Sequence, residues 1–298
     1  MKVIVAEKCG FCPGVRNAIS IAEKILAFKE GRENDVGSQT RKGAFGGPVY
    51  SLGPIIHNKD MVERLAESGL KTVNKVEEIR SGTVLIRSHG AAPEQIARLK
   101  EKGVTIVDAT CVLVKRVQHI AEELARDGYK VVIIGDQNHP EVRAVVGCAR
   151  DAIVIADESD LRKLPENARL GIVCQTTQSP EYFGRMLGAI ARGSFNELKV
   201  INTLCQEAIK RQKSAVQLCK KVDIMFVLGS LESANTRKLA ELCKKYNSET
   251  FHLQNWKELD KNTLFGKNVA GVTAGASTPE WIIDDFVENL EAFDTGGG

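Results

Sequence analysis

The chain has 298 residues, of which 43% are hydrophobic, and it carries 41 basic against 38 acidic side chains. This length and apolar content suit one large α/β domain or a few modest modules with buried cores. The formal net charge of +3 is too small to indicate nucleic-acid binding, although it is compatible with a small anionic ligand. Aromatic residues make up 5% of the chain, so surfaces that stack on bases are not expected.

The N-terminus, "MKVIVAEKCG", has a short apolar run followed at once by charge, which is typical of a strand and not of a signal peptide. No apolar stretch approaches the roughly 20 residues that a membrane span needs. We therefore expect a cytoplasmic protein without membrane attachment, whose eight cysteines stay reduced. Thiolate chemistry or metal binding is then expected of them, and not a disulfide scaffold.

Cys9 and Cys12 form a C-x-x-C pair just after this first strand. Such a pair occurs in thioredoxin-like dithiols, in halves of zinc sites and among iron–sulfur ligands. At this point of the chain all three interpretations are open.

Short β-branched runs alternate with helical patterns along the whole chain. The runs expected as strands are 2–6, 49–53, 83–88, 104–108, 130–135, 152–156, 170–174, 199–203, 223–229 and 268–273. Amphipathic stretches such as 60–69 and 236–246 are expected as helices between them. Apolar strands separated by such helices are typical of parallel sheets covered on both faces, so the predicted fold class is α/β with mostly parallel sheets.

An internal repeat runs through these elements. Cys12, Cys111 and Cys205 each stand at the start of a predicted helix, and a strand that ends in glycine follows each helix. Cys111 and His139 are 28 residues apart, and Cys205 and Ser233 are also 28 apart. The repeat predicts three α/β modules related by a pseudo-threefold axis.

The spacing of the repeat also predicts where the modules begin and end. Cys12 and His57 are 45 residues apart, and we assign the excess to a flexible insertion at about 31–47. No strand follows the last helix, so the strand within residues 1–12 is expected to complete the sheet of the third module. The expected modules and tail are 13–108, 109–203, 204–294 and a disordered 295–298.

The three cysteines are expected to converge on a central cavity, because functional loops gather at the carboxyl ends of parallel strands. A helix N-terminus also favours the thiolate form. Three thiolates suit a 4Fe–4S cluster that keeps one iron without a protein ligand. Zinc held by three cysteines and a water or histidine is the rival interpretation. Cys148, Cys174, Cys219 and Cys243 do not recur in the repeat and are expected to be small buried residues.

The loops after the strands supply polar side chains to the same place. These are His57, Asn58, His89, His139, Glu141, Thr176, Thr177, Ser233, Asn235 and Ser277. Their alternative role is that of ordinary turn and capping residues. Histidine, hydroxyl and amide donors nevertheless suit a diphosphate in a chain that lacks a P-loop motif. Glu141 is an acid among anion-binding donors, so proton delivery is its expected role, whereas Glu94, Glu181 and Glu280 are expected in first helical turns.

At this point nine ordered motifs resemble one known family. "GFCPGV", "GPIIHN", "RSHG", "DATC", "NHPEV", "QTT", "NTLC", "SAN" and "VTAGAST" are similar to those of the 4-hydroxy-3-methylbut-2-enyl diphosphate reductases of the non-mevalonate isoprenoid pathway. The resemblance covers essentially the whole chain. It implies a cluster enzyme that reductively removes the substrate's hydroxyl group to give isopentenyl and dimethylallyl diphosphates.

The resemblance also implies a role for each matching residue. Cys12, Cys111 and Cys205 would hold one 4Fe–4S cluster with one open iron, and Glu141 and Thr176 would be catalytic, with Glu141 as the proton source. The implied diphosphate ligands are His57, His89, His139, Ser233, Ala234, Asn235 and Ser277, with Thr176 near the substrate hydroxyl. The implied electron donor is a ferredoxin or a flavodoxin, and the expected state is a monomer.

The chain departs from the family pattern at Ala234, where many members have a second serine, so that a backbone N–H remains as the donor. The insertion at about 31–47 is longer than expected, and Cys9 stands where the family does not usually have a cysteine. Two alternatives compete with the reductase: a cluster-dependent dehydratase that needs no electron donor, and a scaffold with a structural metal. Cys9 has no counterpart in the repeat and is expected to be a bystander thiol, exposed to oxidation when the cluster is lost.

Overall fold

The computed structural model describes residues 1–29 and 47–293. The predicted tail at 295–298 and all but the last residue of the predicted insertion lie outside these ranges. The described residues contain three four-stranded sheets in which every strand pair is parallel. This confirms the predicted α/β class with parallel sheets. Over the same ranges, no helix combines the length and apolar character needed to cross a membrane.

The first sheet has the strand order β3-β2-β4-β5. Its face toward α3 is filled by alternating strand residues such as Val84 and Ile86, which pack against Leu99 of α3. This part of the chain consists of α1 (Pro13–Lys29), β2 (Val49–Leu52), α2 (Lys59–Glu67), β3 (Leu70–Val73), η1 (Val76–Glu78), β4 (Thr83–Ile86), α3 (Pro93–Glu101) and β5 (Thr105–Asp108).

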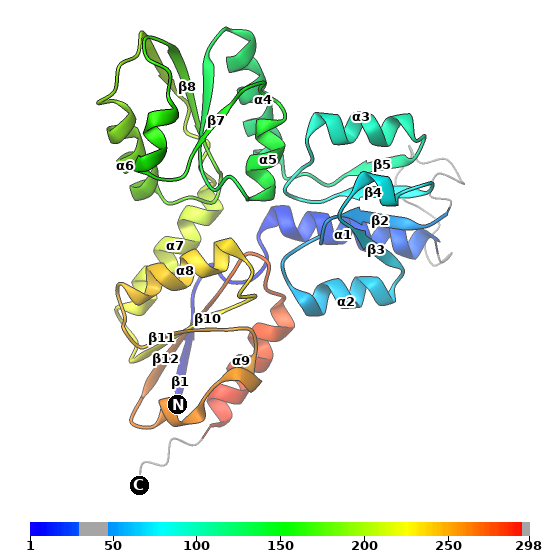
Figure 1. Ribbon diagram of the computed structural model, residues 1–298. Helices are drawn as coiled ribbons and strands as arrows, with labels where there is room; N and C mark the ends of the chain where they lie inside the picture. The colour runs from blue at the N-terminus through cyan, green and yellow to red at the C-terminus, as the bar shows by residue number, and fades with distance from the viewer. Residues whose placement is uncertain (30–46, 294–298) are drawn as a thin grey trace. The chain divides into compact units, whose positions relative to one another are not determined.

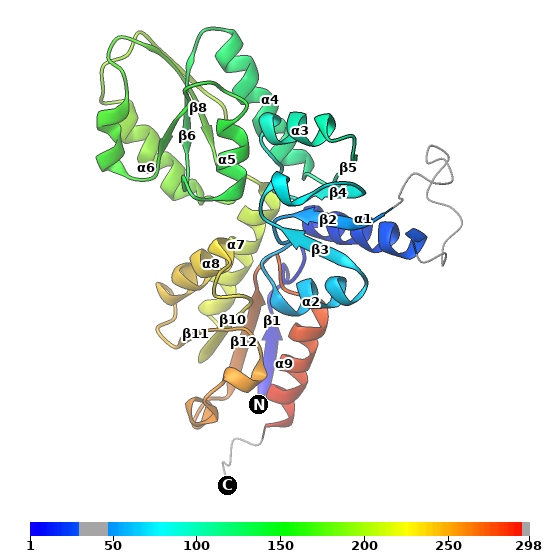
Figure 2. The ribbon, with the colours of Figure 1, turned by 45° about the vertical axis from the view of Figure 1, so that its right-hand side comes forward.

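The second sheet has the equivalent order β7-β6-β8-β9. Val131 and Ile133 of β6 face the helices α4 and α5, and α6 lies on the other side of the sheet (Figure 2). The elements are α4 (Val112–Arg126), β6 (Lys130–Ile134), α5 (Pro140–Val146), β7 (Ile153–Ile155), η2 (Glu158–Lys163), β8 (Arg169–Cys174), α6 (Pro180–Ile190) and β9 (Glu197–Val200).

The third sheet has the order β1-β12-β10-β11. Successive residues of β10 point to opposite faces: Met225 packs with residues of α7 and α8, and Phe226 packs with residues of α9. Figure 1 shows these helices on the two sides of the sheet. The elements are β1 (Lys2–Val5), α7 (Gln206–Cys219), β10 (Ile224–Leu228), α8 (Ala234–Lys244), β11 (Thr250–Leu253), η3 (Trp256–Glu258), η4 (Lys261–Leu264), β12 (Val269–Ala274) and α9 (Glu280–Ala292).

The strand that leads into each of the three repeated cysteines takes the same place in its sheet. β5 pairs with β4, β9 pairs with β8, and β1 pairs with β12, always at an edge. The N-terminal strand therefore completes the sheet formed by the last strands of the chain, as its position in the repeat predicts. The strand expected at 199–203 begins and ends earlier, at Glu197–Val200, because Asn202 and Thr203 form the turn toward Cys205.

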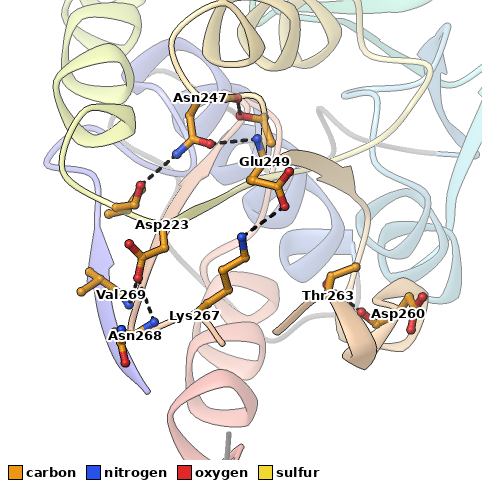
Figure 3. A network of polar contacts seen from close by, with 10 residues as sticks. Asp223, Asn247, Glu249, Asp260, Thr263, Lys267, Asn268 and Val269 are labelled. Carbon is orange, nitrogen blue, oxygen red and sulfur yellow. Dashed lines mark hydrogen bonds and ion pairs between the residues drawn. The ribbon is translucent and has the colours of Figure 1, made fainter. Parts of the chain in front are cut away.

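A polar network joins the starts of three strands in the third sheet (Figure 3). The Asp223 carboxylate, just before β10, accepts hydrogen bonds from the backbone N–H groups of Asn268 and Val269 at 2.8 and 2.9 Å. These backbone donors hold the pKa of Asp223 below its usual value. Lys267 forms an ion pair with Glu249 at 3.4 Å. The loop before β12 is thereby fixed to the strands beside it.

By compactness the chain divides into two units. Unit 1 comprises Met1–Arg16, Ile56–Arg64 and Gln206–Gly298, and unit 2 comprises Asn17–Ile55 and Leu65–Cys205. The third sheet belongs to unit 1, and the first and second sheets belong to unit 2. The three modules with the boundaries given above remain a prediction.

Candidate active site

The three repeated cysteines occupy equivalent local positions. Each directly precedes a helix, namely α1, α4 or α7. The backbone N–H of each cysteine donates to a carbonyl two residues beyond the end of the neighbouring strand. The three pairs are Cys12 with Ala276 at 3.3 Å, Cys111 with Ser88 at 3.0 Å and Cys205 with Thr176 at 2.8 Å. The repeat therefore extends to the backbone contacts that fix these loops.

Cys12 shows what a helix start provides to a sulfur atom. The backbone N–H of Val15 donates to the Cys12 Sγ across 3.4 Å, and the side chain is half-buried. An N–H group at a helix N-terminus carries partial positive charge and stabilises a thiolate. Cys12, Cys111 and Cys205 form no disulfide bond and are partly accessible, which suits metal ligation.

Cys9 differs from Cys12 in its surroundings. It packs against the core that contains Phe286 and Leu290 of α9. Burial raises the pKa of the Cys9 thiol to about 11, and the opposing charge of Arg211 does not reverse this. Cys9 is therefore a protonated, partly buried thiol, so the structure does not support the expectation of a readily oxidised exposed group.

A turn built on Asp108 leads the chain into Cys111. The Asp108 Oδ1 accepts hydrogen bonds from the backbone N–H of Thr110 at 2.9 Å and from its hydroxyl at 2.5 Å. Lys115, in the first turn of α4, reaches the other carboxylate oxygen at 2.6 Å. Burial opposes ionisation of Asp108, but the hydrogen bonds from Lys115 and Thr110 outweigh it and lower the pKa. The phrase Asp-Ala-Thr-Cys thus encodes a turn that positions the cysteine.

The same turn recurs before Cys205. The Asn202 Oδ1 accepts a hydrogen bond from the backbone N–H of Leu204 at 3.0 Å, in the same two-residue pattern. Asparagine can replace aspartate here because either side chain offers the accepting oxygen. Thr203 contributes a further link, since its Oγ1 contacts the backbone N–H and C=O of Cys174 at 2.8 and 2.5 Å.

Glu141 and Thr176 form a buried pair in unit 2. Glu141 stands in the first turn of α5, and Thr176 stands in the loop after β8; they are 2% and 4% exposed. The backbone N–H of Thr176 donates to the Glu141 Oε1 at 2.7 Å, and the Thr176 hydroxyl donates to Oε2 at 2.8 Å. The carbonyl of this same threonine accepts the Cys205 amide. The predicted proton donor is therefore linked through Thr176 to a predicted cluster ligand.

His139 caps the helix that carries Glu141. Its Nδ1 accepts the backbone N–H of Glu141 at 3.2 Å, so in the neutral ring the proton is on Nε2. The imidazole, 8% exposed, lies edge-on to His89 with ring centroids 5.3 Å apart. Unit 2 therefore contains the edge-on pair of His89 and His139 and the hydrogen-bonded pair of Glu141 and Thr176, together with the loops of Cys111 and Cys205.

The remaining predicted ligands belong to unit 1, on three different loops. His57 precedes α2 and is half-buried, and Ser277, also half-buried, precedes α9. Ser233 caps α8, accepting the Thr236 N–H at 3.4 Å, and Ala234 and Asn235 begin that helix.

Several residues have roles other than ligand binding. Asn58 caps α2 by accepting the N–H of Met61 at 2.9 Å. Glu94, Glu181 and Glu280 stand in first helical turns, as expected. Cys174, Cys219 and Cys243 are buried as expected, but Cys148 is only half-buried.

Sequence reasoning missed Arg211, a buried cation next to the N-terminal loop of unit 1. Its side chain, 6% exposed, donates to the carbonyl of Ala274 at 2.9 Å and reaches that of Lys8 at 3.5 Å. Arg211 shares a helix face with the buried residues Ala215 and Leu218, a spacing visible in the sequence. The position of this arginine on an apolar face of a predicted helix was the signal from which its burial could have been predicted.

Comparisons with known proteins identify the family of the chain. The family model described as LytB protein matches residues 3–291. The 4-hydroxy-3-methylbut-2-enyl diphosphate reductase of Alkaliphilus oremlandii (strain OhILAs) is 40% identical over 292 residues, which cover 97% of this chain and 99% of that protein. The enzyme of the same name from Geobacter sulfurreducens is 38% identical over 296 residues, covering 99% of this chain and 98% of that protein.

Solved structures give the same result. One is that of (E)-4-hydroxy-3-methyl-but-2-enyl diphosphate reductase, named as the terminal enzyme of the non-mevalonate pathway. It is 39% identical with a TM-score of 0.69 and covers 98% of this chain and 100% of its own. The E-1-hydroxy-2-methyl-but-2-enyl-4-diphosphate reductase from Plasmodium falciparum is 26% identical with a TM-score of 0.87, covering 99% of this chain and 89% of that one. Matched over nearly its whole length in sequence and structure, the chain belongs to the LytB protein family.

Proposed function

We propose that this LytB-family reductase removes the hydroxyl group of 4-hydroxy-3-methylbut-2-enyl diphosphate and gives isopentenyl and dimethylallyl diphosphates. The reaction takes up two electrons and two protons and releases the oxygen as water. The observation that carries the proposal is the buried Glu141–Thr176 pair attached to the Cys205 loop. The names of the relatives support the substrate.

The proposed cofactor is one 4Fe–4S cluster held by Cys12, Cys111 and Cys205. Three half-buried cysteines at helix starts, none of them in a disulfide bond, have the chemistry that such a cluster needs. When bound, the cluster would supply the electrons and an iron without a protein ligand. Among the described residues no three side chains of His, Cys, Asp or Glu are grouped to hold a metal ion. Of the proposed ligands, Cys12 belongs to unit 1, and Cys111 and Cys205 belong to unit 2.

The diphosphate would be bound by neutral donors. His139 supports this role, because its Nδ1 is used by the Glu141 N–H and its Nε2–H remains the donor of the neutral ring. His89 lies edge-on beside it. The proposed set is completed by His57, Ser233, the backbone of Ala234, Asn235 and Ser277, which stand at or near helix starts that favour anions.

Glu141 would deliver the proton to the substrate, either through the Thr176 hydroxyl or directly from its own carboxyl group. The Thr176 hydroxyl now donates to the carboxylate. When Glu141 is protonated, the same hydroxyl can accept from the acid and turn its own hydrogen toward the substrate hydroxyl. The second bond, from the Thr176 N–H to Oε1, would hold the carboxyl group in one orientation throughout.

The electron donor would be a ferredoxin or a flavodoxin, and the protein would act as a monomer in the cytoplasm. A reducing compartment suits eight cysteines of which none forms a disulfide bond. Neither partner nor compartment affects the role assigned to Glu141.

The test is anaerobic purification with iron, sulfide and zinc analysis, followed by turnover with the diphosphate substrate and a chemical reductant. We expect iron and sulfide, and product formation that depends on the reductant. Turnover without any reductant would favour the dehydratase alternative. Zinc in place of iron would overturn the proposal, and so would a cluster whose Mössbauer spectrum does not change when the substrate is added.

A further inference from the structure

A polar cavity lies within unit 2, next to segments that carry residues of the candidate active site. Its volume is about 270 Å³. Its lining comes from the ends of β2 and β4, the start of α3 and the N-terminal half of α5: Leu52, Gly53, Pro54, Asn74, Arg87, Gly90, Ala91, Ala92, Gln95, Pro140, Arg143 and Ala144. Among the residues that the structure describes, those that line this cavity include two arginines and no aspartate or glutamate. They include none of the predicted catalytic, substrate-binding or cluster residues.

Arg87 forms the inner wall of this cavity. Its side chain is half-buried directly after β4, and Nη1 donates to the carbonyl of Pro54 at a long 3.3 Å. The guanidinium lies flat against Gly53, where a Cβ atom would stand 2.8 Å from the Arg87 Cζ. Glycine at position 53 is thus needed for the close approach, besides its positive φ of 77°.

Arg143 brings a second guanidinium to the same cavity. It is exposed on α5, and its Nη2 has only a marginal contact, at 3.5 Å, with the Asn138 Oδ1. Burial and then the nearby charge of Arg143 lower the pKa of Arg87. Neither arginine forms an ion pair with another described residue.

Two cations that face one cavity without a carboxylate repel each other, and a partly buried charge is costly unless it is paired. A purely structural role would account for Arg87, because it ties β4 to the loop after β2. It does not account for Arg143, which adds repulsion and makes no strong bond. An anion bound between the two guanidiniums would remove their repulsion and would supply the negative charge that the lining of the cavity lacks.

We infer that this cavity binds the phosphoryl group of a small molecule, between Arg87 and Arg143. Arginine presents paired N–H donors that match phosphate oxygens, and two arginines balance a dianion. The volume suits a phosphate or diphosphate group better than a large ligand. Gln95 also lines the cavity, and its Oε1 accepts the backbone N–H of Ala92 at 3.1 Å.

Both arginines of this site lie close in sequence to residues of the proposed active site. The inference itself does not rest on the proposed function. Arg87 is two residues before His89, and Arg143 is two residues after Glu141. A bound phosphoryl group would therefore join the loop after β4 to α5. Both segments carry residues of the candidate active site.

The test is chemical footprinting of arginines with phenylglyoxal on the full, anaerobically purified protein, mapped by mass spectrometry. Inorganic phosphate and inorganic diphosphate should slow modification of Arg87 and Arg143, while the exposed Arg150 remains unaffected. A phosphate bound only at the proposed substrate site would protect neither arginine. Equal modification of Arg87 and Arg143 with and without phosphate would overturn the inference. Protection by acetate at the same concentration would contradict the phosphoryl assignment.

A variant series measures the affinity. In Arg143→Gln, the phosphate concentration that protects Arg87 should rise by about tenfold or more, the loss of one charge-assisted contact. Arg150→Gln is the matched control and should leave the phosphate concentration that protects Arg87 unchanged. Because Arg143 is exposed, its replacement does not disturb the core. Unchanged protection of Arg87 in Arg143→Gln would refute the two-arginine site.

Discussion

Both carboxylate oxygens of Glu141 accept hydrogen bonds from Thr176, one from the backbone N–H at 2.7 Å and one from the hydroxyl at 2.8 Å. The two residues come from α5 and from the loop after β8, 35 positions apart in the chain. A buried carboxylate needs such partners, because desolvation without them is costly. This arrangement holds an acid in one orientation next to the Cys205 loop, and it leads to the first two predictions.

Glu141→Gln should retain iron and sulfide but lose most turnover, by about 10²-fold or more, the usual contribution of a general acid. The amide keeps the shape and can still accept the Thr176 N–H, but it holds no acidic proton. Turnover with substrate and reductant, normalised to iron content, is the measurement. Glu181→Gln, which changes an exposed first-turn acid of α6, is the control and should be unaffected. Normal turnover in Glu141→Gln would sink the proton-donor assignment.

Thr176→Val should lower turnover by about tenfold or more and should also lower the free energy of unfolding by about 1–3 kcal/mol. Valine keeps the branched shape and the backbone N–H but leaves the Glu141 Oε2 without its hydroxyl partner. Thr176→Ser restores the hydroxyl and should restore turnover. A serine variant as slow as the valine variant would show that the methyl group, and not the hydroxyl, matters here.

The repeat in the sequence was sufficient to predict three equivalent parallel sheets and the position of the N-terminal strand beside β12. The edge strands β3 and β11 were not predicted. Both are short and interrupt the apolar run with polar residues, as in "LKTV" and "TFHL". The edge strands β1, β5 and β7 keep mostly β-branched runs and were predicted, so the signal depends on the residues of the strand and not on its place at an edge.

In the candidate site, sequence reasoning identified residue types and missed tertiary partners. The spacing of the repeat placed Cys111 at a helix start, but only the fold shows that Asp108 fixes the turn before it. The cavity between Arg87 and Arg143 could not be predicted either. These arginines are 56 positions apart, outside the repeat pattern, and meet because α5 packs beside the loop after β4.

Asp108→Asn should make the protein less stable at neutral pH but not at low pH. The pKa of Asp108 is lower in the folded chain than its ordinary value, because the hydrogen bonds from Lys115 and Thr110 outweigh the effect of burial. A depressed carboxyl pKa stabilises the fold above the unfolded value of about 4, and this stabilisation is lost as the pH falls through the folded value. The measurement is the unfolding midpoint in denaturant, followed from pH 7 downward.

At pH 7 we expect Asp108→Asn to unfold at a lower denaturant concentration than the wild type. This gap between the two unfolding midpoints should disappear as the pH falls. Asp151→Asn, in an exposed turn, is the control and should show no such gap. A gap that is independent of pH would mean that shape, and not the charge of Asp108, holds the turn.

Cys12→Ala should lose iron, whereas Cys9→Ala should keep it, even though the two thiols are three positions apart. The Cys12 sulfur accepts an N–H at the start of α1, which favours a thiolate ligand. The Cys9 thiol is held protonated, because burial raises its pKa to about 11. Iron and sulfide per chain after anaerobic purification, together with the visible spectrum, are the measurement. Cys111→Ala and Cys205→Ala should behave like Cys12→Ala, since all three cysteines share the same helix-start position and backbone contact. If Cys9→Ala lost its iron as well, the C-x-x-C pair would act as a unit and the threefold assignment of ligands would be wrong.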